Sequence, residues 1–514
     1  MTTRDGWDGL RLGDLLESTG AALALDGPAA ADADLAALRA APVPNVVIDS
    51  RVAAPGDLFV ALPGAHTDGA RFAGDAYARG ALAALTTRAP DPSPAQRAAR
   101  QALLGEAGPR PFASLIVPDP LVALQQVAAD WRGRHSGVRV VGVTGSVGKT
   151  TTREAVAGVL AAAMPTLVSP RSYNNEIGLP LTLLGLRARH RAAVLEMGMY
   201  ARGEIAALAA LARPALGVVT MVAPVHLERL GSMEAIAAAK AELVQALPTD
   251  GVAILNGDDA RVRAMAALTG ARALFYGLDE GNDWRAVAID DRGLDGLRFT
   301  LTYKEWRARV ETSVVGRHFV HALLAAAAAG AELGVPRDII IAALRDMKIG
   351  ERQRFHDGRD GLLVIDDSWN ASPPSMLAAL DVLVAVPRRR VAVLGGMREL
   401  GAESEAAHRQ VGRRAGAVAH ELVAVGPEAA ALAEEALAAG MRREAVHLVA
   451  TTAEAPAALR ASLQPGDAVL VKGSRALCLE DTVRWLLGGE PAPPAPLPDV
   501  GEGDGGEGCS GHDY

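Results

Sequence analysis

Short apolar runs alternate along most of the chain with stretches in which apolar residues recur at helical spacing. Strands that alternate with helices predict βαβ units, in which helices cover both faces of a parallel sheet. Two such series are present. The first contains the apolar runs 139–143, 192–199, 216–222 and 251–259, and the second contains 362–368, 390–397, 420–426, 445–450 and 467–474, with a final helix over 481–487.

The first hundred residues have a different pattern. Residues 44–62 favour two short strands around the turn signal Pro55-Gly56, and 73–85 has the spacing of a helix. The proline- and serine-rich stretch 86–96 interrupts regular structure, so we interpret 87–112 as a boundary with a helical insert. The prediction is an α/β fold in three domains: a smaller N-terminal domain (1–112), a central parallel-sheet domain (113–337) and a further α/β domain (338–489), followed by a disordered tail (490–514).

Composition supports a folded protein and removes several other classes. Half of the 514 residues are hydrophobic and 22% are charged, which is typical of globular domains and excludes a mostly disordered chain or a collagen-like fibre. The net charge of −8 arises largely in the Pro- and Gly-rich tail, which has six acidic residues and no Lys or Arg. The rest of the chain is nearly neutral and shows no basic stripe, so we expect small-molecule partners and no nucleic acid.

Cysteine content and apolar runs bear on the compartment. Cys478 and Cys509 are the two cysteines, too few for a disulfide framework and compatible with a reducing compartment. The first residues lack the apolar segment of a signal peptide, and no uninterrupted apolar run is long enough to span a membrane. We therefore expect a cytoplasmic protein, and a monomer.

A glycine-rich loop between a predicted strand and a predicted helix carries the strongest chemical signal. Its sequence, TGSVGKT, can direct backbone N–H groups, a helix N-terminus and the Lys149 charge towards phosphates, with Thr150 available to Mg²⁺. The loop is shorter than the standard pattern, which has a glycine where Val143 stands. The alternative is a glycine-rich turn with an incidental lysine. The expected nucleotide contacts are Thr144, Gly145, Ser146, Val147, Gly148, Lys149, Thr150 and Thr151.

Three further residues follow later in the same domain. Glu196 ends an apolar run, His226 follows another, and Lys240 lies on a predicted helix. Ligands of parallel sheets gather at the carboxyl ends of the strands, so Glu196 and His226 can both reach the phosphate loop and hold a divalent cation. Taken singly, each has a simpler interpretation, as a structural histidine or a solvated lysine.

Motifs spread over nearly the whole chain resemble those of the ATP-dependent Mur ligases of peptidoglycan precursor synthesis. They most resemble the members that join D-alanyl-D-alanine to UDP-N-acetylmuramoyl-tripeptide. The resemblance implies an N-terminal domain for the UDP end of the substrate, a central ATPase domain and a Rossmann-like C-terminal domain for the amino component. The segments that carry it, in chain order, are DSR, TGSVGKTTT, SYNNEIGLPLTLL, EMGM, HLERLGS, AKAEL, LNGDDARV, GRHFVHALLAAAA, IDDSWNASPPSM, LGGMRELG and VLVKGSRALCLE.

The resemblance also implies a reaction and residue roles. The tripeptide carboxylate becomes an acyl phosphate at the expense of ATP, and the dipeptide amine then displaces the phosphate. It assigns Lys149, Glu196, His226 and Lys240 to catalysis, and two Mg²⁺ sites to Thr150, Glu196, His226 and a carbamylated Lys240. Further ATP contacts are implied for Asn256, Phe319, Arg352 and Asp367, and substrate contacts for Ser50, Arg51, Asn174, Asn175, Lys472, Ser474 and Arg475.

Several positions depart from the family pattern. Phe319 and Ala322 stand where the family often has two asparagines linked to adenine, so we expect adenine to pack on Phe319 or His321. Trp369 replaces a tyrosine, and Ala70 a histidine on the uridine side. The alternatives left open are a related Mur ligase with another amino component, a non-catalytic nucleotide-binding regulator, and a P-loop motor or transport ATPase, which the third α/β domain disfavours.

Overall fold

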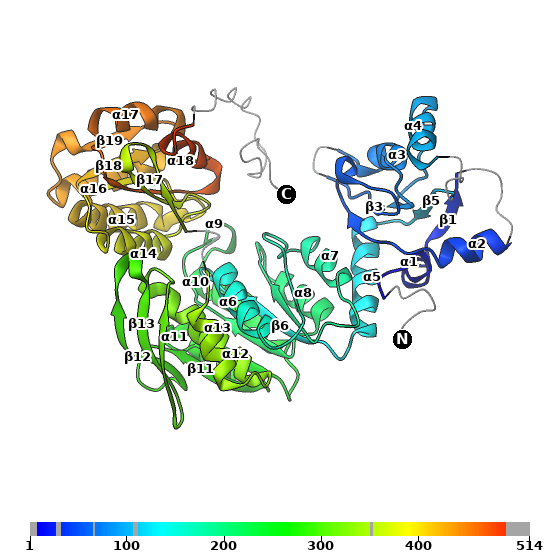
Figure 1. The fold of residues 1–514 in the computed structure, drawn as a ribbon, viewed down its shortest axis with the longest axis horizontal. Helices are drawn as coiled ribbons and strands as arrows, with labels where there is room; N and C mark the ends of the chain where they lie inside the picture. The colour runs from blue at the N-terminus through cyan, green and yellow to red at the C-terminus, as the bar shows by residue number, and fades with distance from the viewer. Residues whose placement is uncertain are drawn as a thin grey trace.

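Three α/β domains, each built around its own sheet, make up the structure (Figure 1). The central domain lies between the other two. No helix within the described part of the chain is both long and apolar enough to cross a bilayer. The computed structural model describes residues 8–26, 32–64, 67–105, 111–225, 227–349 and 353–489, so the predicted disordered tail lies outside the described residues.

The N-terminal domain contains a five-stranded sheet of order β1-β5-β4-β3-β2, in which only β1 is antiparallel to its neighbour. Helix α4 begins where Ser93 caps it and Pro94 occupies its first turn, as the sequence of a helix start predicts. The elements are β1 (Ala22–Leu25), β2 (Val46–Val47), β3 (Leu58–Val60), β4 (Ala83–Thr86), β5 (Ala113–Ile116), α1 (Leu12–Thr19), α2 (Asp32–Arg39), α3 (Ala73–Ala78) and α4 (Pro94–Leu104).

The central domain holds a nine-stranded sheet of order β14-β13-β12-β11-β10-β9-β6-β8-β7, parallel except for the antiparallel β12–β13–β14 end. Its strands are β6 (Arg139–Thr144), β7 (Thr166–Val168), β8 (Ala192–Glu196), β9 (Leu216–Val219), β10 (Val252–Asn256), β11 (Arg272–Gly277), β12 (Trp284–Asp291), β13 (Leu297–Tyr303) and β14 (Trp306–Thr312). Its helices are α5 (Pro120–Arg134), α6 (Lys149–Ala161), α7 (Gly178–Leu184), α8 (Glu204–Ala212), α9 (Leu227–Leu230), α10 (Met233–Gln245), α11 (Ala260–Ala264), α12 (Val320–Glu332) and α13 (Arg337–Arg345).

The C-terminal domain is a six-stranded sheet of order β15-β16-β20-β17-β18-β19, with only β15 antiparallel. Alternate residues of its strands pack on opposite faces: Ala392 and Leu394 lie under α14–α16, whereas Val391 and Val393 lie under α17 and α18. The elements are β15 (Arg354–Asp357), β16 (Leu363–Asp367), β17 (Arg390–Gly395), β18 (Glu421–Val425), β19 (Val446–Val449), β20 (Ala468–Lys472), α14 (Pro373–Val384), α15 (Ser404–Val418), α16 (Ala430–Ala438), α17 (Ala455–Ser462) and α18 (Glu480–Leu486).

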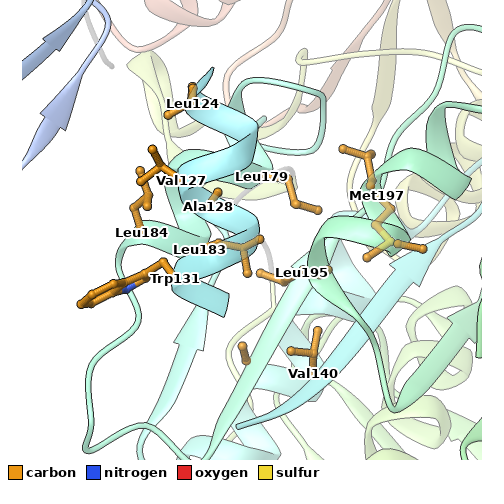
Figure 2. Close-up of a cluster of buried hydrophobic side chains, with 14 of the residues drawn as sticks. Leu124, Val127, Ala128, Trp131, Val140, Leu179, Leu183, Leu184, Leu195 and Met197 are labelled. Atoms are coloured by element: carbon orange, nitrogen blue, oxygen red, sulfur yellow. The ribbon is translucent and has the colours of Figure 1, made fainter. Parts of the chain in front are cut away.

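One continuous core joins the first two domains through α5. Figure 2 shows the apolar side of α5 against α7 and the central sheet. The Trp131 indole N–H donates to the Leu186 carbonyl at 3.2 Å, so the large ring is buried without losing its polar partner. The helix therefore holds the N-terminal domain against the central domain. The side chains in the cluster include Leu124, Val127, Ala128, Trp131, Val140, Leu179, Leu183, Leu184, Leu195 and Met197.

The α/β class and the alternating series are confirmed, but two details of the sequence prediction differ from the structure. The predicted helix over 73–85 is wrong in its second half, because Gly80 at φ +88° interrupts it and Ala83–Thr86 forms β4. In the structure β5 belongs to the first sheet and α13 packs on the central domain. The antiparallel extension β12–β14 was not anticipated.

Candidate functional site

The predicted chemistry gathers at the carboxyl ends of the strands in two sheets. In the central sheet, β6 leads into the phosphate loop (144–150), β8 ends at Glu196 and β10 ends at Asn256. In the C-terminal sheet, β16 ends at Asp367 and β20 at Lys472. The two edges face each other across a cavity of about 560 Å³, which is lined by the loop and α6 on one side and by α14, Asp367 and Lys472 on the other. A cavity of this size accommodates a nucleotide.

The phosphate loop adopts a conformation that only glycine allows at two positions. Gly145 has φ +147°, and a Cβ there would lie 1.8 Å from the Thr220 hydroxyl; Gly148 has φ +84° and caps α6. Lys149 Nζ donates to the carbonyls of Gly145 and Ser146 at 2.9 and 3.3 Å, so its charge lies at the loop. The loop thus presents a helix N-terminus and an ammonium group to the cavity.

A short hydrogen-bonded chain leads from α6 to Glu196. Thr150 Oγ1 donates to Glu196 Oε2 at 2.9 Å, and Asn174 Nδ2 donates to Glu196 Oε1 at 2.8 Å. Glu196 is buried, and the Ser169 hydroxyl accepts from its backbone N–H at 3.1 Å. A hydroxyl, a carboxylate and an amide side by side are oxygen donors that suit Mg²⁺ when phosphates supply the remaining ligands. No group of three or more His, Cys, Asp or Glu with metal-site geometry occurs among the described residues.

Lys240 lies on α10 with only 2% of its surface exposed. Burial, together with the positive charge of Lys149, lowers the pKa of Lys240 well below its usual value. The lowered pKa favours the free amine, which is the form of a lysine that reacts with CO₂. His226 and Arg352 lie outside the described residues.

Asn256 and the following residues form a closed polar cluster on the cavity wall. His321 Nε2 lies 2.8 Å from Asp258 Oδ2, and the backbone N–H of Leu278 donates to the same oxygen at 2.7 Å. Burial opposes ionisation of Asp258, but these bonds, with a second from the Asp279 N–H, lower its pKa below the usual value. His321 is thereby held by Asp258, and Asn256 accepts from the Asp258 N–H at 3.1 Å.

The C-terminal side of the cavity is organised by Lys472. Its Nζ donates to Asp367 Oδ2 at 2.7 Å and to the Asn370 carbonyl at 2.9 Å, with 3% of the side chain exposed. Buried charges persist when they are paired in this way. Asp367, an expected ATP contact, and Lys472, an expected substrate contact, therefore form one ion pair that lines the cavity.

Part of the cavity wall is made of ring and apolar side chains. They include Phe319, which is 8% exposed, together with Ala322, His321 and the ring of Tyr276. The His318 ring lies 4.0 Å from the Phe319 ring, and the surrounding protein lowers the pKa of His318, with a further contribution from Lys472. This wall offers ring faces rather than asparagine amides to a base.

Comparisons with known proteins agree with this geometry. Three family models cover most of the chain: "Mur ligase family, catalytic domain" matches residues 42–131, "Mur ligase middle domain" matches 143–330, and "Mur ligase, glutamate ligase domain" matches 351–475. The chain belongs to the Mur ligase family. The resemblance drawn from its motifs is confirmed, as is its class as a ligase.

Its relatives include named enzymes and solved structures. The UDP-N-acetylmuramoyl-tripeptide--D-alanyl-D-alanine ligase of Mycobacterium bovis is 40% identical over 84% of this chain and 90% of its own, and that of Escherichia coli is 36% identical over 86% and 93%. MurF from Acinetobacter baumannii superposes with a TM-score of 0.78 at 28% identity, covering 93% of this chain and 98% of its own. MurF from Thermotoga maritima, solved with ADP, gives 0.72 at 26% identity, with 86% and 96% covered.

The remaining expected site residues that the structure describes lie in three regions. Asn174 reaches the Glu196 chain, whereas Asn175 caps α7 by accepting from the Gly178 N–H at 2.9 Å. Ser50 is buried and Arg51 is exposed beside Asp49 in the N-terminal domain; neither lines the cavity between the central and C-terminal domains. Beyond β20, the Ser474 hydroxyl accepts from the Arg398 N–H at 3.0 Å, and Arg475 pairs with Glu480 at 2.6 Å.

Asn370 and Gln353 are among the cavity residues that were not anticipated from the sequence. Asn370 contributes its backbone carbonyl to Lys472, a role that no side-chain motif reveals. Gln353 is 7% exposed and lines the cavity, and its Oε1 has no hydrogen-bond partner among the described residues. No motif marked it: it lies immediately before β15, which is antiparallel to β16, and Arg354 at the start of β15 pairs with Asp366 near the end of β16.

Proposed function

We propose that this chain joins D-alanyl-D-alanine to UDP-N-acetylmuramoyl-tripeptide at the expense of ATP. The observation that carries the proposal is the cavity that the phosphate loop shares with the Asp367–Lys472 pair. It brings a phosphate-binding edge of one domain against a second α/β domain, as a reaction between a nucleotide and two further substrates requires. The relatives that bear this activity in their names match the chain over most of its length.

The chemistry proceeds in two balanced steps. A carboxylate oxygen of the tripeptide attacks the γ-phosphorus, the bond to the bridging oxygen breaks, and ADP leaves. The dipeptide amine then attacks the acyl carbon, the carbon–oxygen bond to phosphate breaks, and the amine loses a proton. Lys149 and the loop N–H groups offset the charge that spreads over the transferred group.

We assign one Mg²⁺ site to Thr150 and Glu196, and a second Mg²⁺ site to His226 and Lys240. When bound, Mg²⁺ reduces the repulsion between the carboxylate and the triphosphate. Lys240 would contribute as a carbamate: its neutral amine forms a bond to the carbon of CO₂ and releases a proton. The product is an anion on a helix where the sequence has only a cation.

The substrate side extends into the first domain. Ser50 and Arg51 would contact the uridine diphosphate, and Asn174 and Asn175 the muramoyl peptide between the two domains. Ser474 and Arg475 would lie on the side of the amino component. In this proposal each domain consists of one of the three sheets and the helices that pack on it. A nucleotide-sugar substrate is consistent with an enzyme of the cytoplasm.

Phosphate release tests the proposal directly. We expect ADP and phosphate to form only when ATP, the muramoyl tripeptide and D-alanyl-D-alanine are all present. Replacing the dipeptide with single amino acids is the matched control for the other ligases of the family. ATP binding without turnover on any muramoyl peptide would contradict the proposal and favour a regulator.

The carbamate has its own test. Lys240→Ala should abolish phosphate release, and short carboxylic acids such as formate should restore part of it by occupying the space of the carbamate. Lys240→Arg, which keeps a long basic side chain but cannot form a carbamate, should be inactive and not rescued. An active Lys240→Ala enzyme would remove Lys240 from the metal site.

A further inference from the structure

Trp369, near the start of the C-terminal domain, has the guanidinium groups of two arginines over its ring. Trp369 stands in the loop between β16 and α14, and its ring is 3.7 Å from the Arg171 guanidinium carbon and 4.2 Å from that of Arg475. Both guanidinium groups are within cation–π distance of the same ring, and we call these three residues the Arg-Trp-Arg stack.

The two arginines come from different domains. Arg171 follows β7 in the central domain, whereas Arg475 follows β20 in the same domain as Trp369. Arg475 is held in place by Glu480 at 2.6 Å, so the Trp369–Arg475 half of the stack is built within the C-terminal domain. Arg171 supplies the half that crosses between domains.

Each side of the stack continues into the site. Asn174, three residues after Arg171, donates to Glu196 at 2.8 Å, and Glu196 accepts from Thr150 at 2.9 Å. On the other side, Trp369 lies between Asp367 and Asn370, the two acceptors of Lys472. The stack therefore joins the loop that positions Glu196 to the loop that positions Lys472.

We propose that Arg171, acting through Trp369, is a positioning residue that holds the C-terminal domain over the phosphate loop. The proposal rests on the proposed function only in taking the nucleotide to be ATP. Stacking of a guanidinium on tryptophan is planar and directional, so it fixes the orientation of the two loops as well as their distance. A lysine at 171 would keep the charge but lose the planar contact.

Nucleotide affinity is the first measurement. Arg171→Met removes the contact between the domains and should raise the Kd for ADP about five- to tenfold, as expected for a partly buried cation–π contact. The Kd is measured by titration calorimetry on the full chain. Arg171→Lys should show most of this loss, and Trp369→Phe should recover much of the affinity lost in Trp369→Leu. Arg189→Met, at an exposed position of the central domain, is the matched control and should not change the Kd.

Kinetics and coupling distinguish positioning from a general structural role. The KM for ATP should rise in Arg171→Met while kcat at saturating ATP stays within about twofold, because ligand binding restores closure. Arg171→Met should add little in a Trp369→Leu background. Unchanged ADP affinity in Arg171→Met, or fully additive effects, would overturn the proposal. Because ADP binding needs no ligation, a wild-type chain without ligase activity would reject the proposed function and leave this test intact.

Discussion

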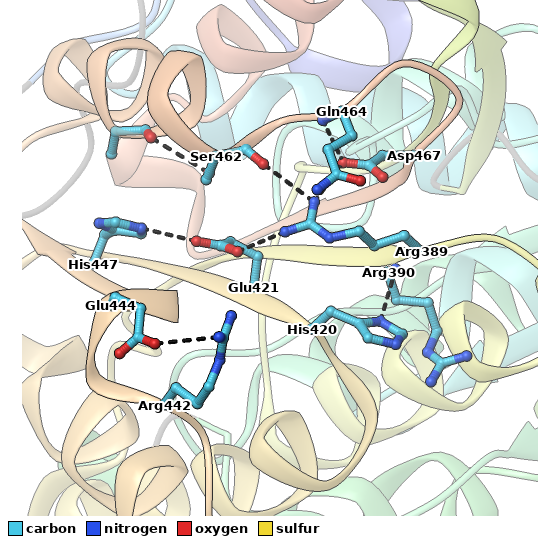
Figure 3. Close-up of polar contacts among 11 residues, drawn as sticks. Arg389, Arg390, His420, Glu421, Arg442, Glu444, His447, Ser462, Gln464 and Asp467 are labelled. Carbon is cyan, nitrogen blue, oxygen red and sulfur yellow. Dashed lines mark hydrogen bonds and ion pairs between the residues drawn. The ribbon is translucent and has the colours of Figure 1, made fainter.

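The two edges of the C-terminal sheet both carry buried charges, yet these charges face different surroundings. At the amino edge, Arg389 donates to Glu421 and to Asp467 at 2.7 Å each, and His447 lies 3.0 Å from the other Glu421 oxygen (Figure 3). The Gln464 N–H also donates to Asp467, at 2.8 Å. This network joins segments at the starts of β17, β18 and β20, and its residues do not line the cavity at the phosphate loop.

At the carboxyl edge, the Asp367–Lys472 pair is as short but lines the cavity shared with the phosphate loop. Parallel sheets bind ligands at the carboxyl ends of their strands, where loops diverge and leave room. The comparison teaches that burial and pairing alone do not mark a functional charge. We expect a functional charge where an ion pair lines a cavity that is shared with a second binding edge.

The largest effect that would sharpen this comparison is expected at the carboxyl edge of the central domain. Lys149→Met removes the charge that faces the phosphates and should lower phosphate release about a thousandfold, with the midpoint of thermal unfolding unchanged within about 1 °C. Lys304→Met, in the turn between β13 and β14, is the control and should be fully active. A large loss of thermal stability in Lys149→Met would break the comparison.

The opposite behaviour is expected at the amino edge. Arg389→Met leaves the buried carboxylates of Glu421 and Asp467 without their cation. It should lower the free energy of unfolding by about 2 to 3 kcal/mol and the unfolding midpoint by roughly 5 to 10 °C. At temperatures below that midpoint, kcat should be unchanged. Calorimetry and phosphate release measure the two quantities. Arg442→Met, which loses an exposed pair with Glu444, should change neither. A fall in kcat would show that this edge contributes to the reaction.

A smaller effect is expected where the base would pack. Phe319→Ala removes a ring face from the cavity wall and should raise the KM for ATP about tenfold with little change in kcat. Phe319→Leu keeps apolar volume, so its KM for ATP should lie between those of the wild type and Phe319→Ala. An unchanged KM for ATP in Phe319→Ala would disprove the packing of adenine on this ring.

The smallest effect tests a cavity residue that we expect to act in stability. The pKa of Asp258 is lowered from its usual 3.8, so its contribution to stability is complete above that value and is lost as the pH falls below it. Asp258→Asn should therefore show a flatter decline of unfolding free energy than the wild type between about pH 4 and pH 2, measured by urea unfolding. Parallel declines in the two proteins would contradict this assignment.

Part of the site could be predicted because its chemistry is local in the chain. Gly145, Gly148 and Lys149 form a loop within a few residues, and the strand before it and the helix after it are evident from apolar periodicity. Glu196 could be predicted for a related reason, since a charged residue that ends an apolar strand lies at the carboxyl edge of the sheet. The β12–β14 extension was not predicted. Its alternation of apolar and polar residues indicates strands, but not that they pair with the edge of the central sheet.

The sequence by itself determined the parallel α/β domains, the phosphate loop and the family, because periodicity, glycine spacing and motif order depend on near neighbours in the chain. Three contacts could be seen only in the folded chain: Asp367 pairs with Lys472, Asp258 holds His321, and Trp369 contacts arginines from two domains. These contacts join residues tens to hundreds of positions apart. Which distant side chains meet depends on how whole domains pack, and no local pattern encodes that.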